Sequence, residues 1–166
     1  DLLAQSHPAL VREAAPELAP LADAPLEPFT LDSLAEMLPL IGIQRFQSDG
    51  TTAIYAWVND VLFAFALDNG PSLIIKGHWD PSLEEAEFTR LFLICNDWNR
   101  AHHGAVAFCH HTFEGLQVRM DAATITAAGL TRPQLFSAVG RGLKHILHGI
   151  DDIAREVTGA SPVEWP

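Results

Sequence analysis

The sequence predicts an α+β fold in which an antiparallel sheet of about five to six strands is covered by helices. Short apolar runs recur between residues 43 and 79, separated by turn residues and not by helices. A helical stretch and a strand pair follow, and a long amphipathic segment comes last. Strands joined by such short turns pair antiparallel, so the expected order is α-ββββ-α-ββ-α.

The first elements follow an arm at residues 1–28 that is rich in Ala, Pro and Leu, where proline disfavours regular structure. Thr30 is a suitable cap for a helix over about residues 31–41, and Pro39 should bend or end that helix. Four strands are then expected, at about 43–48, 53–59, 61–68 and 72–79.

The strand at 61–68 has bulky side chains on one face and smaller ones on the other, because successive residues of a strand point to opposite sides. Asn59-Asp60 before it favours a tight turn, since both residue types tolerate positive φ. We expect the bulky face to meet the core helices. The small face either allows close approach of another element or subunit, or stands half exposed. The bulky set is Val61, Phe63, Phe65 and Leu67, and the small set is Leu62, Ala64 and Ala66.

A second helix is expected to begin at Asp80-Pro81, with Asp as the cap and Pro in the first helical position. Glutamates at 84, 85 and 87 would suit its positive end. The helix should run to His102 or His103, and Gly104 is the usual kind of C-terminal stop. A strand pair at about 105–111 and 115–125 follows.

The last helix has the clearest local signals in the chain. Thr131 is its expected cap, and Gln134 stands in the capping-box position. Gly142 and Gly149 flank the apolar stripe and each costs about 1 kcal/mol relative to Ala, so close backbone packing or a kink should explain them. The stripe consists of Leu135, Val139, Leu143, Ile146, Leu147, Ile150, Ile153 and Val157.

One domain is expected at residues 29–159, followed by a loose tail at 160–166. The formal net charge of −11 argues against nucleic acid and against a membrane surface as partners, because binding there depends on Lys and Arg. No stretch approaches the roughly 20 apolar residues of a membrane helix. Two cysteines without a CxxC motif favour a cytoplasmic location. The chain begins with Asp1, which leaves a removed targeting segment open.

Three motifs resemble the YbjN family in its actinobacterial form: GHWD at 77–80, CNDWNR at 95–100 and TITAAGLTRPQL at 124–135. The resemblance covers about 29–157, and His102-His103-Gly104 departs from the polar entry that the family usually has before its next strand. It implies a fold similar to type III secretion chaperones, which bind extended polypeptide and commonly dimerise. Members are often labelled sensory transduction regulators, and no established catalytic residue comes with the family.

The candidate surface for a partner or ligand comprises Trp79, Asn96, Trp98, Asn99 and Arg100. Asn96 and Asn99 lie away from the core stripe of their helix, where they either tie it to a neighbouring loop or contact a ligand. The two tryptophans are expected to be packing anchors; exposed, they would mark a partner surface instead.

Metal, cofactor and catalytic sites are not expected. His110 and His111 are neighbours in a strand and point to opposite faces, while His145 and His148 form at most half a metal site. Cys95 falls on the apolar face of its helix as an inert thiol, and a bond to Cys109 is left open. Neither the neighbouring carboxylates nor any glycine-rich loop provides a catalytic constellation.

The sequence therefore predicts a non-enzymatic, chaperone-like or regulatory protein-binding module that forms a homodimer and binds a peptide or protein client. An added strand at a sheet edge and a groove beside the last helix are its two expected modes of binding. The alternative is a small-ligand-binding protein or enzyme with a pocket near Asn96, Asn99 and His103. That alternative predicts a deep, polar-lined cavity with a perturbed titrating group.

Overall fold

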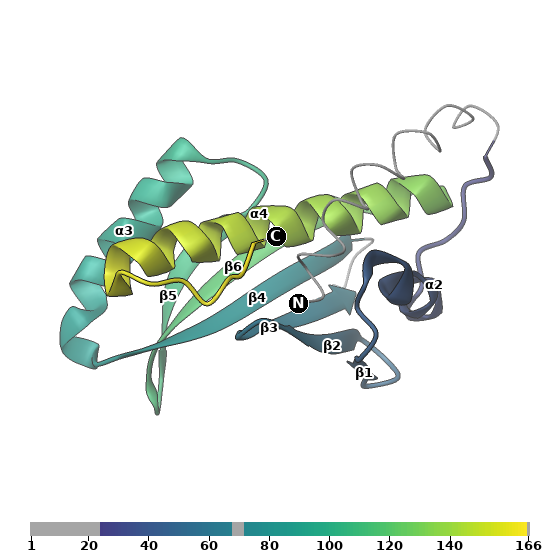
Figure 1. Ribbon diagram of the computed structural model, residues 1–166. Coiled ribbons are helices and arrows are strands. Elements are labelled where there is room, and N and C mark those ends of the chain that lie inside the picture. The colour runs from purple at the N-terminus through teal and green to yellow at the C-terminus, as the bar shows by residue number, and fades with distance from the viewer. Residues whose placement is uncertain (1–23, 68–71, 166) are drawn as a thin grey trace.

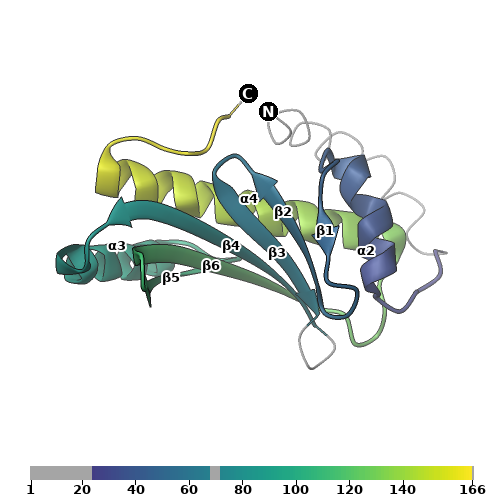
Figure 2. The same ribbon diagram turned by 90° about the horizontal axis from the view of Figure 1, so that it is seen from below.

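The computed structural model describes residues 24–67 and 72–165, and in these residues a six-stranded antiparallel sheet carries its two longer helices on one face, while the first helix lies beside the first strand at the end of the sheet (Figures 1 and 2). The strand order is β1-β2-β3-β4-β6-β5. The helices are α2 (Leu31–Met37), α3 (Phe88–Ala101) and α4 (Arg132–Thr158). The strands are β1 (Gln47–Ser48), β2 (Ala53–Val58), β3 (Val61–Leu67), β4 (Ser72–Leu83), β5 (Val106–Thr112) and β6 (Gly115–Ile125).

The core lies between the sheet and the helices. The bulky face of β3 points inward, where Phe63 and Phe65 are fully buried and their ring centroids lie 6.4 Å apart. The prediction for that face is confirmed. The opposite face of β3 is smaller and partly open, and none of the described helices covers it (Figure 2).

Helix α4 runs across the sheet (Figure 1), and all residues of its predicted apolar stripe are buried. Thr131 and Gln134 form the reciprocal capping box. A Cβ at Gly142 would lie 2.6 Å from Cδ1 of Ile75, and a Cβ at Gly149 would overlap the end of Met120. Close packing on the sheet, and not a kink, is therefore the reason for these two glycines.

The prediction that a helix begins at Asp80-Pro81 is wrong. Strand β4 continues to Leu83, which pairs with Leu116 of β6 after a register shift. Ser82 takes a positive φ of 57° within this irregular stretch. A 3₁₀ turn at Glu85–Glu87 then leads into α3, so burial of Trp79 and pairing to β6 outweigh the local helix signal.

Other boundaries shift less. The first helix is α-helical over Leu31–Met37 and becomes a 3₁₀ turn (Leu38–Ile41) at Pro39, as that proline predicted. The strand expected at 43–48 pairs only at Gln47–Ser48. Asn59 takes the expected positive φ in the β2–β3 turn, and α3 ends at Ala101, just before the predicted end.

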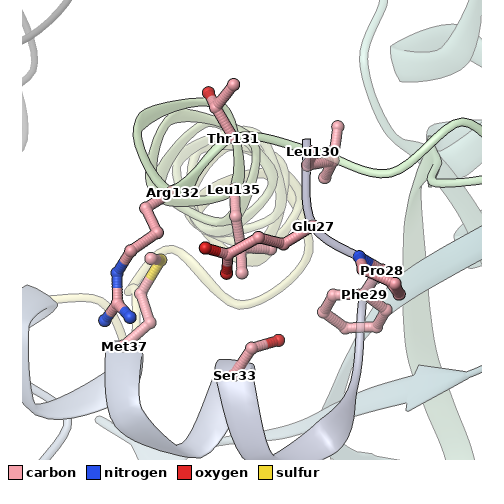
Figure 3. Close-up of a pocket in the computed structure, with 9 residues that line it drawn as sticks. All are labelled: Glu27, Pro28, Phe29, Ser33, Met37, Leu130, Thr131, Arg132 and Leu135. Carbon is pink, nitrogen blue, oxygen red and sulfur yellow. The ribbon is translucent and has the colours of Figure 1, made fainter. Parts of the chain in front are cut away.

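Both ends of the described chain are held to the domain. Glu27 and Leu130 form two backbone hydrogen bonds of 3.0 Å. Both residues line a small cavity of about 20 Å³, together with Ser33 and Arg132 (Figure 3). Val163 is buried, so the residues after α4 pack against the domain instead of forming the expected loose tail. The bulk of the predicted arm, residues 1–23, lies outside the described residues. Within the described ranges, no helix is long and apolar enough to cross a membrane.

Candidate partner-binding site

The five predicted surface residues do not form one surface. Trp79 and Trp98 are each only 7% exposed and belong to the core, as their role as packing anchors predicted. Asn96 is exposed on α3. Arg100 is also exposed and pairs with Asp97 one turn earlier. The predicted cluster therefore separates into core residues and scattered surface residues.

Asn99 joins α3 to the edge of β5. Its Nδ2 donates to the carbonyl of Ala107 at 2.7 Å, and the N–H of Ala107 donates to its Oδ1, also at 2.7 Å. The side-chain amide thus takes the place of a neighbouring strand at one residue of β5. The structure favours the first of the two predicted roles of Asn99, which is to join its helix to a neighbouring segment. That segment is strand β5 and not a loop.

Trp98 is fixed by polar contacts at the end of α3. Its Nε1 donates to Oδ2 of Asp152 on α4 at 3.1 Å. The ring of His102 stacks on the indole with centroids 4.5 Å apart, and His102 Nδ1 lies 2.9 Å from the Trp98 carbonyl oxygen. The bond to Asp152 joins α3 to α4, and the indole of Trp98 therefore has a packing role.

The sulfur and imidazole groups do not form a metal site in the part of the chain that the structure describes. Burial and the nearby Cys109 raise the pKa of Cys95 to about 12, and burial also raises the pKa of Cys109. Both cysteines are free thiols. His111 stacks on Phe88 with centroids 4.3 Å apart, whereas His110 points to the other face of β5. These geometries indicate structural roles.

The directions of the backbone hydrogen bonds show which strand edges are open. Thr112 pairs with Gly115 across a two-residue hairpin loop, so Thr112 and every second residue before it bond to β6. Ala107, Cys109 and His111 therefore direct their N–H and C=O groups away from the sheet. The bonds from Asn99 to Ala107 agree with this pattern and block the edge of β5 at that residue.

Strand β6 extends beyond the start of β5 and has an uncovered edge there. Its register with β5 begins at Asp121–Val106, while its register with β4 continues to Ile125. By the same alternation, Ala123 and Ile125 direct their N–H and C=O groups toward the side that β5 does not reach. Among the described residues, no hydrogen bond to these groups is present. We call this stretch, residues 122–125, the β6 overhang.

The chain before β5 turns away from the overhang. Gly104 has a φ of 94°, and a Cβ there would lie 2.6 Å from the ring of His145 on α4. Glycine at this position therefore lets the connection pack closely on α4. An open cavity of about 470 Å³ lies beside the β6 overhang, where a further strand would otherwise pair. It is lined by Ile74, Asn99, His102, His103, Gly104, Ala105, Val106, Asp121 and Ala123.

Asp121 is the carboxylate residue in the lining of this cavity. Its Oδ1 atom is buried and has no hydrogen-bond partner among the described residues. Burial raises the pKa of Asp121, while the positive charges of Lys76 and Arg119 act in the opposite direction. The cavity thus holds a perturbed carboxyl group, beside Asn99 and His103 as the alternative hypothesis predicted. It does not include Asn96, and it is open to solvent.

On the outer face of the sheet, five side chains from five neighbouring strands form a row. Register pairs place Trp57, Leu62, His78, Arg119 and Phe108 side by side. Trp57 is 65% exposed, and Phe108 is exposed at the other end of the row. Burial and the positive charges of Arg119 and Lys76 lower the pKa of His78.

The sequence-based prediction missed Asp121, Ala123 and the outer aromatic residues. The alternation of apolar and polar residues in β6 was visible in the sequence and could have placed Asp121 on the solvent face, whereas β2 is apolar and aromatic throughout and gave no such signal for Trp57. The overhang itself had no local signal, because it depends on where two distant strands stop pairing.

Comparison with known proteins shows the fold. No protein-family model matches the sequence, and no curated protein matches it. The crystal structure of YbjN from E. coli, described as a candidate transcription regulator, is similar with a TM-score of 0.66 and 14% sequence identity. The match covers 82% of this chain and 98% of that chain. The expected likeness to YbjN is therefore confirmed at the level of the α+β fold.

Proposed function

We propose that this protein is a non-enzymatic polypeptide-binding module that takes an extended segment of a partner as an added strand on the β6 overhang. The observation that carries the proposal is the pair of residues with unpaired N–H and C=O groups, Ala123 and Ile125, of which Ala123 lines the 470 Å³ cavity. Backbone groups of this kind are what strand addition uses for affinity.

The likeness to YbjN supports a regulatory role that acts through a protein partner. Direct binding to DNA is disfavoured, because a formal charge of −11 opposes approach to the phosphate backbone. Free thiols at Cys95 and Cys109 suit a cytoplasmic location, which we include in the proposal.

Backbone-modified peptides test strand addition without changing the protein. A seven-residue peptide of alternating Thr and Val should shift the amide resonances of Ala123 and Ile125. N-methylation of the peptide residues whose N–H groups face β6 should abolish binding, and methylation of the intervening residues should be tolerated. Binding that tolerates both patterns, or shifts confined to another surface, would contradict the proposal.

A protein variant provides the matched test. Ala123→Pro removes the N–H that faces the cavity, while the neighbouring bonds to β4 come from Ala122 and Thr124. This variant should fold and lose peptide binding. Ala127→Pro, at the first central position of the exposed turn after β6, is the control and should bind normally.

A small-ligand site is the second candidate, because the cavity volume lies in the range of about 300–1,000 Å³ typical of ligand pockets and the cavity contains Asp121. A fragment screen by NMR distinguishes the two. Small molecules that bind at Asp121 while every extended peptide fails would favour this candidate.

The expected homodimer is a separate proposal and concerns the outer sheet face. Tyr55, Trp57 and Phe108 are exposed there and could pack against a second copy. Light scattering over micromolar concentrations tests it, and a strict monomer would contradict it.

A further inference from the structure

We infer that the strand added at the β6 overhang carries a basic side chain, Lys or Arg, whose cationic end binds the carboxylate of Asp121. This inference rests on the proposed function and specifies its partner: an extended, basic polypeptide segment.

The carboxylate of Asp121 has unfilled hydrogen-bonding capacity. A buried carboxylate oxygen without a donor carries an uncompensated loss of hydration. Oδ1 of Asp121 is such an atom, and Asp121 is one of the residues that line the cavity that the added strand would enter. A guanidinium or ammonium group supplies donors and positive charge together.

The register of the sheet places an added side chain near Asp121. Ala123 and Asp121 point to the same outer face because they are two residues apart in β6. A residue placed opposite Ala123 on an antiparallel added strand is therefore a diagonal neighbour of Asp121, within reach of a long side chain. Ile74 and Val106 offer apolar contact for the aliphatic stem of that side chain.

The charge of the whole protein also favours a basic partner. The formal net charge of −11 attracts a basic segment at long range and repels an acidic one. Lys76 opposes this locally, because it stands opposite Asp121 on β4. No ion pair joins Lys76 to Asp121 among the described residues, so the carboxylate is still available to a cation from the partner.

The experiment compares three acetylated seven-residue peptides of alternating Thr and Val whose central residue is Arg, norleucine or Asp. Titration of the full chain should give the Arg peptide an affinity about tenfold above that of the norleucine peptide. Asp121→Asn should remove this difference between the Arg and norleucine peptides. Lys76→Met should increase the preference for Arg, because it removes the competing cation.

The outcomes separate this inference from the proposed function. If no peptide binds the wild-type protein, the proposed function fails. If the Arg and norleucine peptides bind equally, or the Asp peptide binds best, strand addition stands and the basic partner is overturned. If peptides bind only after deletion of residues 1–23, or only when a dimer dissociates, the chain itself occupies the overhang and the inference is likewise overturned.

Discussion

The side-chain amide of Asn99 binds both the N–H and the C=O of Ala107, each at 2.7 Å. Through this pair, α3 covers one residue of an otherwise open strand edge. Covering an edge prevents uncontrolled pairing with other chains. The same side of the sheet leaves the β6 overhang uncovered a few residues away, so one stretch is blocked while the next is accessible.

Replacement of Asn99 by Ala should lower the free energy of unfolding by about 1–3 kcal/mol, because a part-buried N–H and C=O lose their partners. Urea unfolding followed by circular dichroism measures this. Asn96→Ala is the matched control on the same helix, and its exposed position predicts a change within about 0.5 kcal/mol. Equal effects of the two substitutions would contradict a role for Asn99 as a tie.

Replacement of Gly149 by Ala should destabilise the protein by about 1 kcal/mol net, although Ala is the better helix former. The new Cβ would overlap the buried end of Met120 and lie 3.0 Å from the Trp98 ring. Thermal unfolding checks this against Lys144→Ala on the exposed side of α4. A more stable Gly149→Ala variant would show that α4 does not approach the sheet so closely.

The carboxylate of Asp49 should make stability depend on acidic pH. It accepts backbone hydrogen bonds from Thr51, Thr52 and Ala53, and these hold its pKa well below the usual 3.8. Because the folded state has the lower pKa, the stabilisation is complete above the unfolded value and is lost as the pH falls through 3.8 toward the folded value.

Unfolding free energies measured from pH 5 to pH 2 check the role of Asp49. The variant Asp49→Asn should show a shallower decline than the wild type, whereas Asp60→Asn in the neighbouring hairpin loop should decline like the wild type. Parallel curves for wild type and Asp49→Asn would rule out this source of pH dependence.

Both thiols should react slowly in the native protein. Burial raises the pKa of Cys95 to about 12 and also raises that of Cys109, so little thiolate exists at neutral pH. A thiol-reactive dye should label neither residue within minutes until urea unfolds the chain, and then both. A rapidly labelled cysteine in the native state would contradict the structural role assigned to it.

Local signals in the sequence predicted the elements that local chemistry determines. The Asn59-Asp60 turn and the Thr131–Gln134 capping box depend on residues close in sequence, and both form as expected. The predicted start of α3 was wrong because Trp79 and Leu83 pair with the distant strand β6, and this pairing outweighs the cap-like signal of Asp80.

The candidate site could be predicted only in part for a related reason. Asn99 was recognised as a tie or contact residue from its place on the helix, whereas its partner Ala107 follows from tertiary packing. The β6 overhang arises from two registers, one with β4 and one with β5, that end at different residues. Neither end point has a motif of its own, so no sequence signal indicated that Ala123 and Ile125 lie beyond the start of β5.

Residue-resolved hydrogen exchange on the full chain without any partner measures directly whether the β6 overhang is open. The amides of Ala123 and Ile125 should exchange rapidly, while those of Ala122 and Thr124, which alternate with them along β6, should be protected by β4. Protection of all four amides would contradict this expectation, because the overhang would then already be paired and closed to a partner.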